Sequence, residues 1–299
     1  MHTAALPLSV TLVVLVAAVT HATWNAIAHG IKDQVLAFGL IGAGGIVVAV
    51  PLVLVSPFPL GACWPYLLAS VFIHVFYNLL LMRSYSCGEF GQVYPLARGT
   101  SPLVVTVLAA VFAAERPSAF QVAGVLVVSA GLAVLVLSGR GGRRSGAGSG
   151  TGSGAGSGMG RAALVAAGGT GLTIAAYTTV DGLGVRLSGS PVAYIGWLML
   201  LESLCVPAWA LARRRRVLGG LSRRVLASGL LAGALSVLAY GLVLWAQSRG
   251  ALAPIAALRE TSVIFGAVIG TVVFREPFGR WRITATVVVV LGVLLLNAS

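Results

Sequence analysis

Two arginine motifs in this chain could bind an anionic group. The sequence reads Arg-Gly-Thr-Ser at residues 98–101 and Arg-Glu-Thr-Ser at residues 259–262, an offset of 161 residues, and both copies lie inside apolar stretches. A guanidinium group presents a planar fork of hydrogen-bond donors, which matches a carboxylate or a phosphate. Arg98 and Arg259 are therefore the first candidates for substrate binding.

The two arginines could also have a purely structural role. A long side chain can extend from a membrane helix to the interface, and a buried arginine can also form an internal ion pair. Asp181 and Glu202 are the acids that we consider as partners of either arginine. Glu260 directly follows Arg259 and could either neutralise it locally or face a different helix.

Three acidic residues are candidates for carrying a proton, namely Asp181, Glu202 and Glu260. Each lies within an apolar stretch of the sequence. An isolated carboxylate in such surroundings is either neutral or paired, because ionisation without a partner is costly. Asp181 could also form a local pair with Arg186, which is five residues further along the chain.

Polar and aromatic side chains recur at helical spacing in other apolar stretches. His21 and Asn25 are four residues apart and share one helix face. A second stretch has a polar face of His74, Tyr77 and Asn78, and a third has one of Tyr240, Trp245 and Gln247. Inside a membrane helix, a polar face is expected to line a cavity. The complete set of predicted substrate-binding residues is Arg98, Arg259, His21, Trp24, Asn25, Tyr77, Asn78 and Tyr240.

The sequence offers no motif for catalysis, metal binding or a cofactor. The three cysteines form no Cys-x-x-Cys pair, and no third ligand accompanies the histidines of the first stretch. There is no Gly-x-Ser-x-Gly, no His-Glu-x-x-His and no phosphate-binding loop. We therefore expect no cofactor and no metal site, and we do not expect an enzyme.

Composition places the chain in a membrane. Hydrophobic residues make up 58% of the 299 residues and charged residues only 9%, whereas a soluble globular chain carries about 25% charged residues. One helical span needs about 20 apolar residues. Ten candidate spans cover residues 6–28, 33–55, 64–83, 92–114, 119–138, 162–185, 191–211, 225–247, 251–273 and 282–298.

The basic residues lie mainly in the loops between these spans. With ten spans the loops alternate sides, so that 15 Lys and Arg fall on one side and 3 on the side that holds both termini. Because cytoplasmic loops carry the basic excess, this distribution places both termini outside. The net charge of +13 therefore reflects topology and indicates no nucleic-acid partner.

A Gly/Ser/Arg-rich linker over residues 139–161 divides the chain into two halves of five spans, residues 1–138 and 162–299. If both halves share one fold, the second must be inserted upside down relative to the first, because five is odd. The predicted fold class is therefore an all-α integral membrane protein with ten transmembrane helices as two inverted five-helix repeats.

The layout resembles the drug/metabolite transporter (DMT) superfamily, and specifically the EamA-type ten-helix permeases. The resemblance rests on the two five-span halves, on the stretches 94–117 and 254–277, and on His-Ala-x-Trp-Asn at residues 21–25. It implies a central cavity lined by the first, third, fourth, sixth, eighth and ninth spans. It also implies both termini in the cytoplasm, contrary to the charge distribution.

These observations together predict a secondary active transporter of a small metabolite in the cytoplasmic membrane, with export favoured over import. It would work by alternating access, as a monomer or homodimer, with the lipid bilayer and a small-molecule substrate as its partners. One alternative is a non-transporting membrane protein, such as a lipid-modifying enzyme or a scaffold. Another is a cation or drug exporter, in which the carboxylates bind the substrate.

Overall fold

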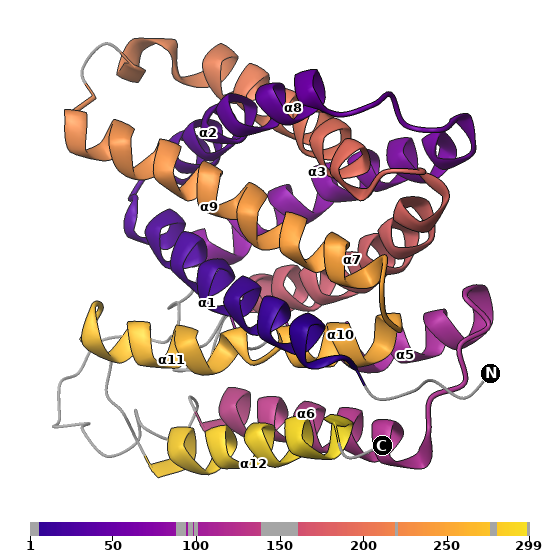
Figure 1. Ribbon diagram of the computed structural model, residues 1–299. Coiled ribbons are helices and arrows are strands. Elements are labelled where there is room, and N and C mark those ends of the chain that lie inside the picture. The colour runs from indigo at the N-terminus through magenta and orange to yellow at the C-terminus, as the bar shows by residue number, and fades with distance from the viewer. Residues whose placement is uncertain are drawn as a thin grey trace, which may run out of the picture.

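The chain folds into a helical bundle in the computed structural model, which describes residues 6–87, 94, 98, 101–138, 161–218, 221–275 and 280–297 (Figure 1). The first half contains α1 (Leu8–Gly30), α2 (Gln34–Val55), a 3-10 helix η1 (Gly61–Cys63), α3 (Trp64–Cys87), α5 (Ser101–Phe112) and α6 (Ala119–Ser138). The second half contains α7 (Arg161–Leu187), α8 (Pro191–Leu218), α9 (Arg223–Gln247), α10 (Leu252–Arg259), α11 (Ser262–Val272) and α12 (Arg280–Asn297). The described residues hold no β-strand, which confirms the all-α class. Residues 139–160 of the predicted linker lie outside the described residues.

The distribution of side chains is that of a membrane protein. Large apolar residues such as Phe72 and Val111 are 65% and 68% exposed, whereas Arg98, Asp181 and Glu260 are buried inside the bundle. Six helices among the described residues are long and apolar enough to cross a bilayer. Charged groups inside and apolar groups outside are the arrangement that hydrocarbon surroundings require. The protein is therefore an integral, multi-pass membrane protein, and the number of ten spans stays a prediction.

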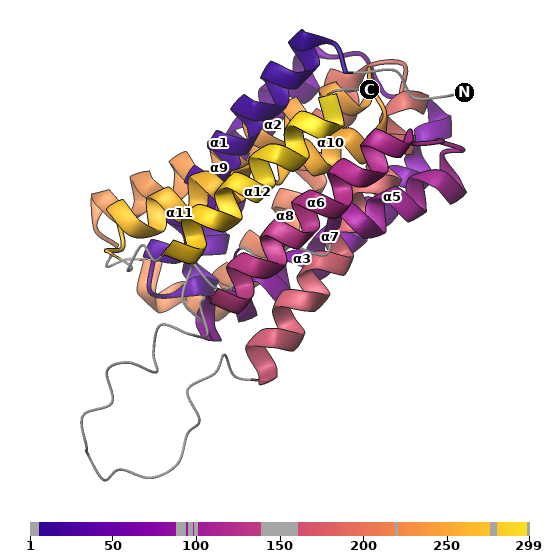
Figure 2. The ribbon, with the colours of Figure 1, turned by 90° about the horizontal axis from the view of Figure 1, so that it is seen from below.

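Helices α6 and α12 lie side by side at one edge of the bundle (Figures 1 and 2). Gly131 of α6 faces Val289 of α12, and Gly292 of α12 faces Val128 of α6. As the residue number rises along α6, the number of the residue that it contacts in α12 falls, so the two helices are antiparallel. Adding 161 to the residue numbers of α6 turns position 131 into 292 and position 128 into 289. The two contact pairs are therefore equivalent under this offset.

The main helix contacts cross between the halves, since α1 packs on α9, α2 on α8 and α3 on α7. The two halves are thus interleaved and share one core.

The ninth predicted span is divided into two helices within the bundle. Helix α10 ends at Arg259 and α11 begins at Ser262, with Glu260 and Thr261 in a turn between them. Here the backbone N–H groups of Glu260 and Thr261 bond three residues back, to the carbonyls of Ala257 and Leu258. The Thr261 hydroxyl donates to the Leu258 carbonyl as well, at 2.8 Å. Short 3-10 turns of this kind interrupt α-helices at functional sites.

The two ends of the bundle differ. At the end where α1 begins and α12 ends (Figure 2), Leu6 packs against Gly250 in the α9–α10 connection. Near the opposite end lies a groove of about 900 Å³ between α1, α9 and α11, with Lys32 and Arg224 among its lining residues. We call these the terminal end and the groove end.

We expect Gly292→Ala to lower the free energy of unfolding. A Cβ at Gly292 would lie 2.8 Å from the Val128 backbone nitrogen, so the α6–α12 contact must open, and such overpacking costs about 1–3 kcal/mol. Thermal unfolding in detergent measures the change.

The matched control is Gly168→Ala in α7, where an added Cβ meets no atom within 4 Å. This change is expected to be neutral or to stabilise by about 0.4–1 kcal/mol, since alanine reduces the entropy of the unfolded chain. Equal effects of the two substitutions would contradict the close α6–α12 contact.

Candidate functional site

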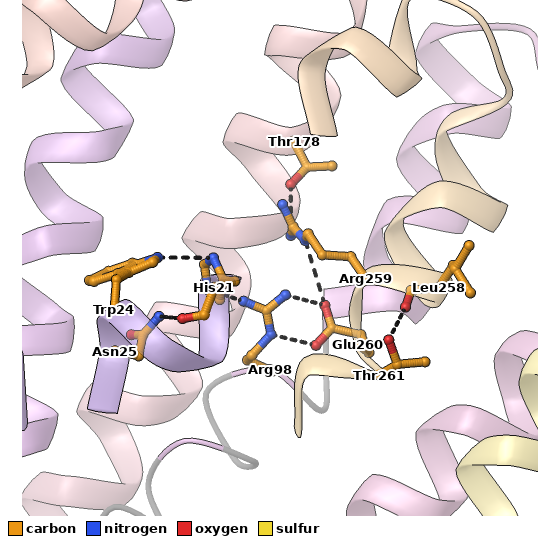
Figure 3. Close-up of polar contacts among 9 residues, drawn as sticks. All are labelled: His21, Trp24, Asn25, Arg98, Thr178, Leu258, Arg259, Glu260 and Thr261. Atoms are coloured by element: carbon orange, nitrogen blue, oxygen red, sulfur yellow. Dashed lines mark hydrogen bonds and ion pairs between the residues drawn. The ribbon is translucent and has the colours of Figure 1, made fainter. Parts of the chain in front are cut away.

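Arg98 and Glu260 form a buried, bidentate ion pair in the middle of the bundle (Figure 3). The Arg98 Nε donates to Glu260 Oε2 at 2.7 Å, and Nη2 donates to Oε1 at 3.0 Å. The two side chains are 2% and 0% exposed. Arg98 belongs to the first half of the chain and Glu260 to the second, so the pair joins the halves. The expectation that Asp181 or Glu202 would pair with Arg98 is therefore wrong.

Arg259 lies beside this pair and has few partners of its own. Its Nη2 donates to Thr178 Oγ1 at 3.3 Å, and its Nε lies 3.9 Å from Glu260 Oε1. Within the described part of the chain, Nε and Nη1 have no hydrogen-bond partner, although the residue is only 1% exposed. Glu260 thus faces a different helix and also partly neutralises Arg259, and neither arginine extends to the surface.

Among the described residues, the cluster carries an excess positive charge. Two guanidinium groups, those of Arg98 and Arg259, share there the one carboxylate of Glu260. The bidentate contact neutralises Arg98, so the excess lies on Arg259. A buried charge without a full set of partners is costly, and this makes Arg259 the group in the cluster that an anion would stabilise most.

Helix α1 supplies the side chains on the other side of Arg98. The Arg98 Nη1 lies 2.6 Å from His21 Nε2, and the Trp24 indole donates to His21 Nδ1 at 3.3 Å. Asn25 donates to the His21 carbonyl at 2.8 Å and accepts from the Tyr85 hydroxyl at 2.5 Å. The polar face predicted for this helix therefore points inward and holds the arginine in place.

A narrow cavity of about 50 Å³ lies next to this cluster. Since one buried water needs at least about 10–15 Å³ measured in this way, the cavity has room for about four waters. Six of the residues singled out from the sequence line it, namely His21, Trp24, Tyr77, Asn78, Glu202 and Tyr240. Asn25, Asp181, Arg98, Arg259 and Glu260 lie outside its lining.

Glu202 enters the cavity from α8, a helix that the family resemblance did not place there. Its Oε1 accepts a hydrogen bond from Asn78 at 3.0 Å, and its Oε2 lies 4.0 Å from His74 Nε2. His74 and Tyr177 also line the cavity, with their rings stacked at 4.0 Å. Neither was among the predicted site residues, although His74 stands one helical turn from Asn78 and could have been included.

Asp181 is fully buried and is held by two phenols. The Tyr194 hydroxyl donates to Oδ1 at 2.9 Å and the Tyr240 hydroxyl donates to Oδ2 at 2.5 Å. The local pair expected with Arg186 does not form. Arg186 instead contacts Glu115 at 3.2 Å, because the α7 residues at 181 and 186 point to different sides of the helix.

Arg186 and Glu115 connect three segments at the terminal end. Arg186 donates to the backbone carbonyls of Gln247 and Gly250 at 3.1 and 2.8 Å. Glu115 accepts from the backbone N–H of Leu252 at 2.9 Å. The network therefore ties the α5–α6 connection and α7 to the start of α10.

Comparison with known proteins identifies the family of the second half. The EamA-like transporter family matches residues 161–298. No curated protein matches the sequence. One solved crystal structure of a protein is similar over 97% of this chain and 96% of that chain, with a TM-score of 0.66 and 16% sequence identity. At this identity the likeness shows a shared fold.

We expect Glu260→Gln to destabilise the protein strongly. The change leaves Arg98 and Arg259 as two buried like charges, and breaking a buried ion pair costs about 3–5 kcal/mol. The double variant Arg98→Met with Glu260→Met removes both charges of the pair and should recover most of the loss. Unfolding temperatures in detergent test this, and a double variant as unstable as Glu260→Gln would contradict the assigned pairing.

Proposed function

Residues 161–298 belong to the EamA-like transporter family of the drug/metabolite transporter superfamily, and from this premise we propose that the protein is a secondary active transporter of a small anionic metabolite. It works by alternating access in the cytoplasmic membrane. Members of the family are transporters and not enzymes, and this argues against a lipid-modifying enzyme.

The observation that carries the proposal is the incomplete hydrogen bonding of Arg259. Two of its three guanidinium nitrogens lack a hydrogen-bond partner within the described residues, in a position that is 1% exposed. A carboxylate or phosphonate that reached Nε and Nη1 would supply both hydrogen bonds and the missing negative charge. Arg98 has a different role in this proposal, because its fork is already occupied by Glu260 and it positions that carboxylate.

Inverted five-helix repeats provide the mechanical basis of the proposal. The antiparallel α6–α12 contact, whose two Gly–Val pairs are related by the offset of 161 residues, supports a two-fold relation between the halves. The break between α10 and α11 directly after Arg259 supports a site at the junction, since discontinuous helices form the binding sites of many transporters with such repeats.

The two ends of the bundle suggest which state of the transport cycle this conformation represents. We infer that the Arg186–Glu115 network holds the terminal end closed, because it ties three segments together there, whereas the groove of about 900 Å³ lies near the other end. The narrow cavity of about 50 Å³ would widen when the halves rock apart. Lys32 and Arg224 belong to the basic side of the chain, so the groove end faces the cytoplasm in this proposal. A carrier that opens there can load its substrate for export.

Arg259→Met is expected to weaken anion binding without unfolding the protein. Wild-type protein should be stabilised by propionate and other small organic acids, by about 2.7 kcal/mol at a hundredfold excess over Kd. Arg259→Met should weaken this binding at least tenfold and should raise the unfolding temperature without ligand, because it removes a buried excess charge.

The control for this experiment is Arg249→Met, which removes a surface arginine stacked on Trp245 at 4.0 Å and leaves the site intact. Flux of labelled organic acids into proteoliposomes provides the second measurement. If Arg259→Met binds and transports anions like the wild type, Arg259 is not the anion site. If the wild-type protein moves no solute, the scaffold alternative gains support.

Arg186→Gln is expected to open the terminal end. Cys63 is fully buried in η1, next to the end of α7, and can report this opening in a protein with Cys87 and Cys205 replaced by alanine. Loss of the Arg186 contacts should increase the rate at which a maleimide labels Cys63 several-fold. Arg249→Gln at the same end should leave the rate unchanged. An unchanged rate in Arg186→Gln would show that the network does not hold this end closed.

A further inference from the structure

The groove near the groove end has mostly apolar walls. Its volume of about 900 Å³ is close to the upper limit of the roughly 300–1,000 Å³ that ligand pockets occupy. Helices α1, α9 and α11 each contribute a large apolar side chain, namely Ile27, Val225 and Ile269. The residues that line the groove are all different from those that line the narrow cavity. The groove is therefore a site of its own, and a ligand there leaves the cavity free.

The groove extends from the end of the bundle into the membrane-spanning part. Along α1 its lining runs from Gly30, the last residue of the helix, back to Thr23, which at 1.5 Å per residue is a depth of about 10 Å. One leaflet of the hydrocarbon core is about 15 Å thick. An apolar groove of this depth on a membrane protein has the dimensions to hold part of a lipid acyl chain.

The mouth of the groove carries positive charge. Lys32 belongs to the connection between α1 and α2, and Arg224 lies in the first turn of α9. Both residues are exposed, and within the described part of the chain neither forms an ion pair. Asp33, the acid among the described lining residues, caps α2, where its carboxylate accepts from the Leu36 backbone N–H at 3.1 Å. Two cations and one engaged carboxylate leave the mouth with a net positive charge.

An anionic phospholipid is complementary to both parts of the groove. Its acyl chain can pack on the apolar walls while its phosphate lies at the mouth, at the level where the helices end. Basic residues at a membrane surface attract anionic lipids. A soluble anion would use the two cations but leave the apolar walls without a partner, so the combination favours a lipid.

We propose that the groove between α1, α9 and α11 is a binding site for an anionic phospholipid. Lys32 and Arg224 hold its phosphate, and the apolar walls hold an acyl chain. Lys32 and α1 belong to the first half of the chain, whereas Arg224, α9 and α11 belong to the second. A bound lipid therefore contacts both halves and stabilises the arrangement described here. This inference goes beyond the proposed transport function and does not depend on it.

Phosphatidylglycerol and phosphatidylcholine with identical dioleoyl chains test the contribution of the headgroup. Delipidated protein in detergent is titrated with each lipid, and binding is measured by native mass spectrometry and by dose-dependent thermal stabilisation. Phosphatidylglycerol should bind at least about tenfold more tightly than phosphatidylcholine, because two cations face its headgroup. Glycerol 1-phosphate, which has the anionic group without acyl chains, should not stabilise the protein.

Arg224→Gln and Arg223→Gln form a matched pair, because these neighbouring arginines are both exposed at the start of α9 but Arg223 is not among the residues that line the groove. Arg224→Gln should weaken phosphatidylglycerol binding about fivefold, the effect of one basic residue near an anionic lipid surface. Adding Lys32→Gln should bring the loss to about 25-fold. Arg223→Gln should behave like the wild type, and phosphatidylcholine binding should change in none of these variants.

Gly30→Leu tests whether the acyl chain occupies the groove. A Cβ at Gly30 would lie 3.9 Å from Phe274 Cε1, an ordinary contact, so leucine fits at the backbone and its side chain takes up space in the groove. This variant should weaken the binding of phosphatidylglycerol and phosphatidylcholine alike. Gly168→Leu in α7 is the control, since an added Cβ there meets no atom within 4 Å and the residue lies outside the groove lining.

Several outcomes would overturn the lipid site. Equal losses in Arg223→Gln and Arg224→Gln would show a general attraction of lipid to the basic end of the bundle. Equal binding of the two lipids, or stabilisation by glycerol 1-phosphate, would refute the assigned headgroup or the role of the acyl chain. Wild-type affinity in Gly30→Leu would place the lipid elsewhere. None of these results bears on anion binding at Arg259, so the lipid site and the transport function are tested separately.

Discussion

The buried ion pair between Arg98 and Glu260 is the interaction on which the rest of this structure depends. A charged side chain inside a membrane protein needs a partner, because neither lipid nor protein solvates it as water does. Each partner here comes from a different half of the chain, so the pairing can form only when the halves are interleaved. The turn at Glu260 and Thr261 places the carboxylate opposite Arg98. One interaction therefore fixes how the halves meet, where the ninth span is divided and which arginine keeps an excess charge.

A transporter benefits from a site that the protein itself leaves incomplete. If every buried charge were balanced internally, a ligand would have to displace an existing ion pair and would bind weakly. Arg259 lacks a full set of hydrogen-bond partners among the described residues, so in the proposed function an anionic ligand adds interactions without breaking any. The unfavourable free energy of leaving Arg259 without a full set of partners is offset by the neutral Arg98–Glu260 pair and by the packing of the interleaved core.

Sequence reasoning located the charged positions but not their pairing. Arg98, Arg259 and the inward face of α1 could be predicted because polar groups in apolar spans must turn away from lipid. The partner of Arg98 could not, because Glu260 reaches it only through the turn after Arg259, and hydrophobic patterning does not reveal a break within a span. The polar face of α3 already included His74, whereas Tyr177 could not be predicted because an aromatic residue in a membrane helix is more often part of the core. Asp181 was assigned a local partner from its spacing to Arg186, but two phenols from other helices hold it.

The two arginine motifs are equivalent in spacing but not in charge, and this difference explains the site. Arg259 is followed by Glu260, whereas Arg98 is followed by Gly99. Two repeats that each carried an arginine and a glutamate would supply one carboxylate for each guanidinium, and the centre would be neutral. With a glycine at position 99, the second half provides the carboxylate for the first half's arginine, and the described residues return no equivalent carboxylate to Arg259. Among these residues the excess charge is therefore a consequence of asymmetry between two otherwise matching motifs, and in the proposed function the acidic group of the substrate neutralises it.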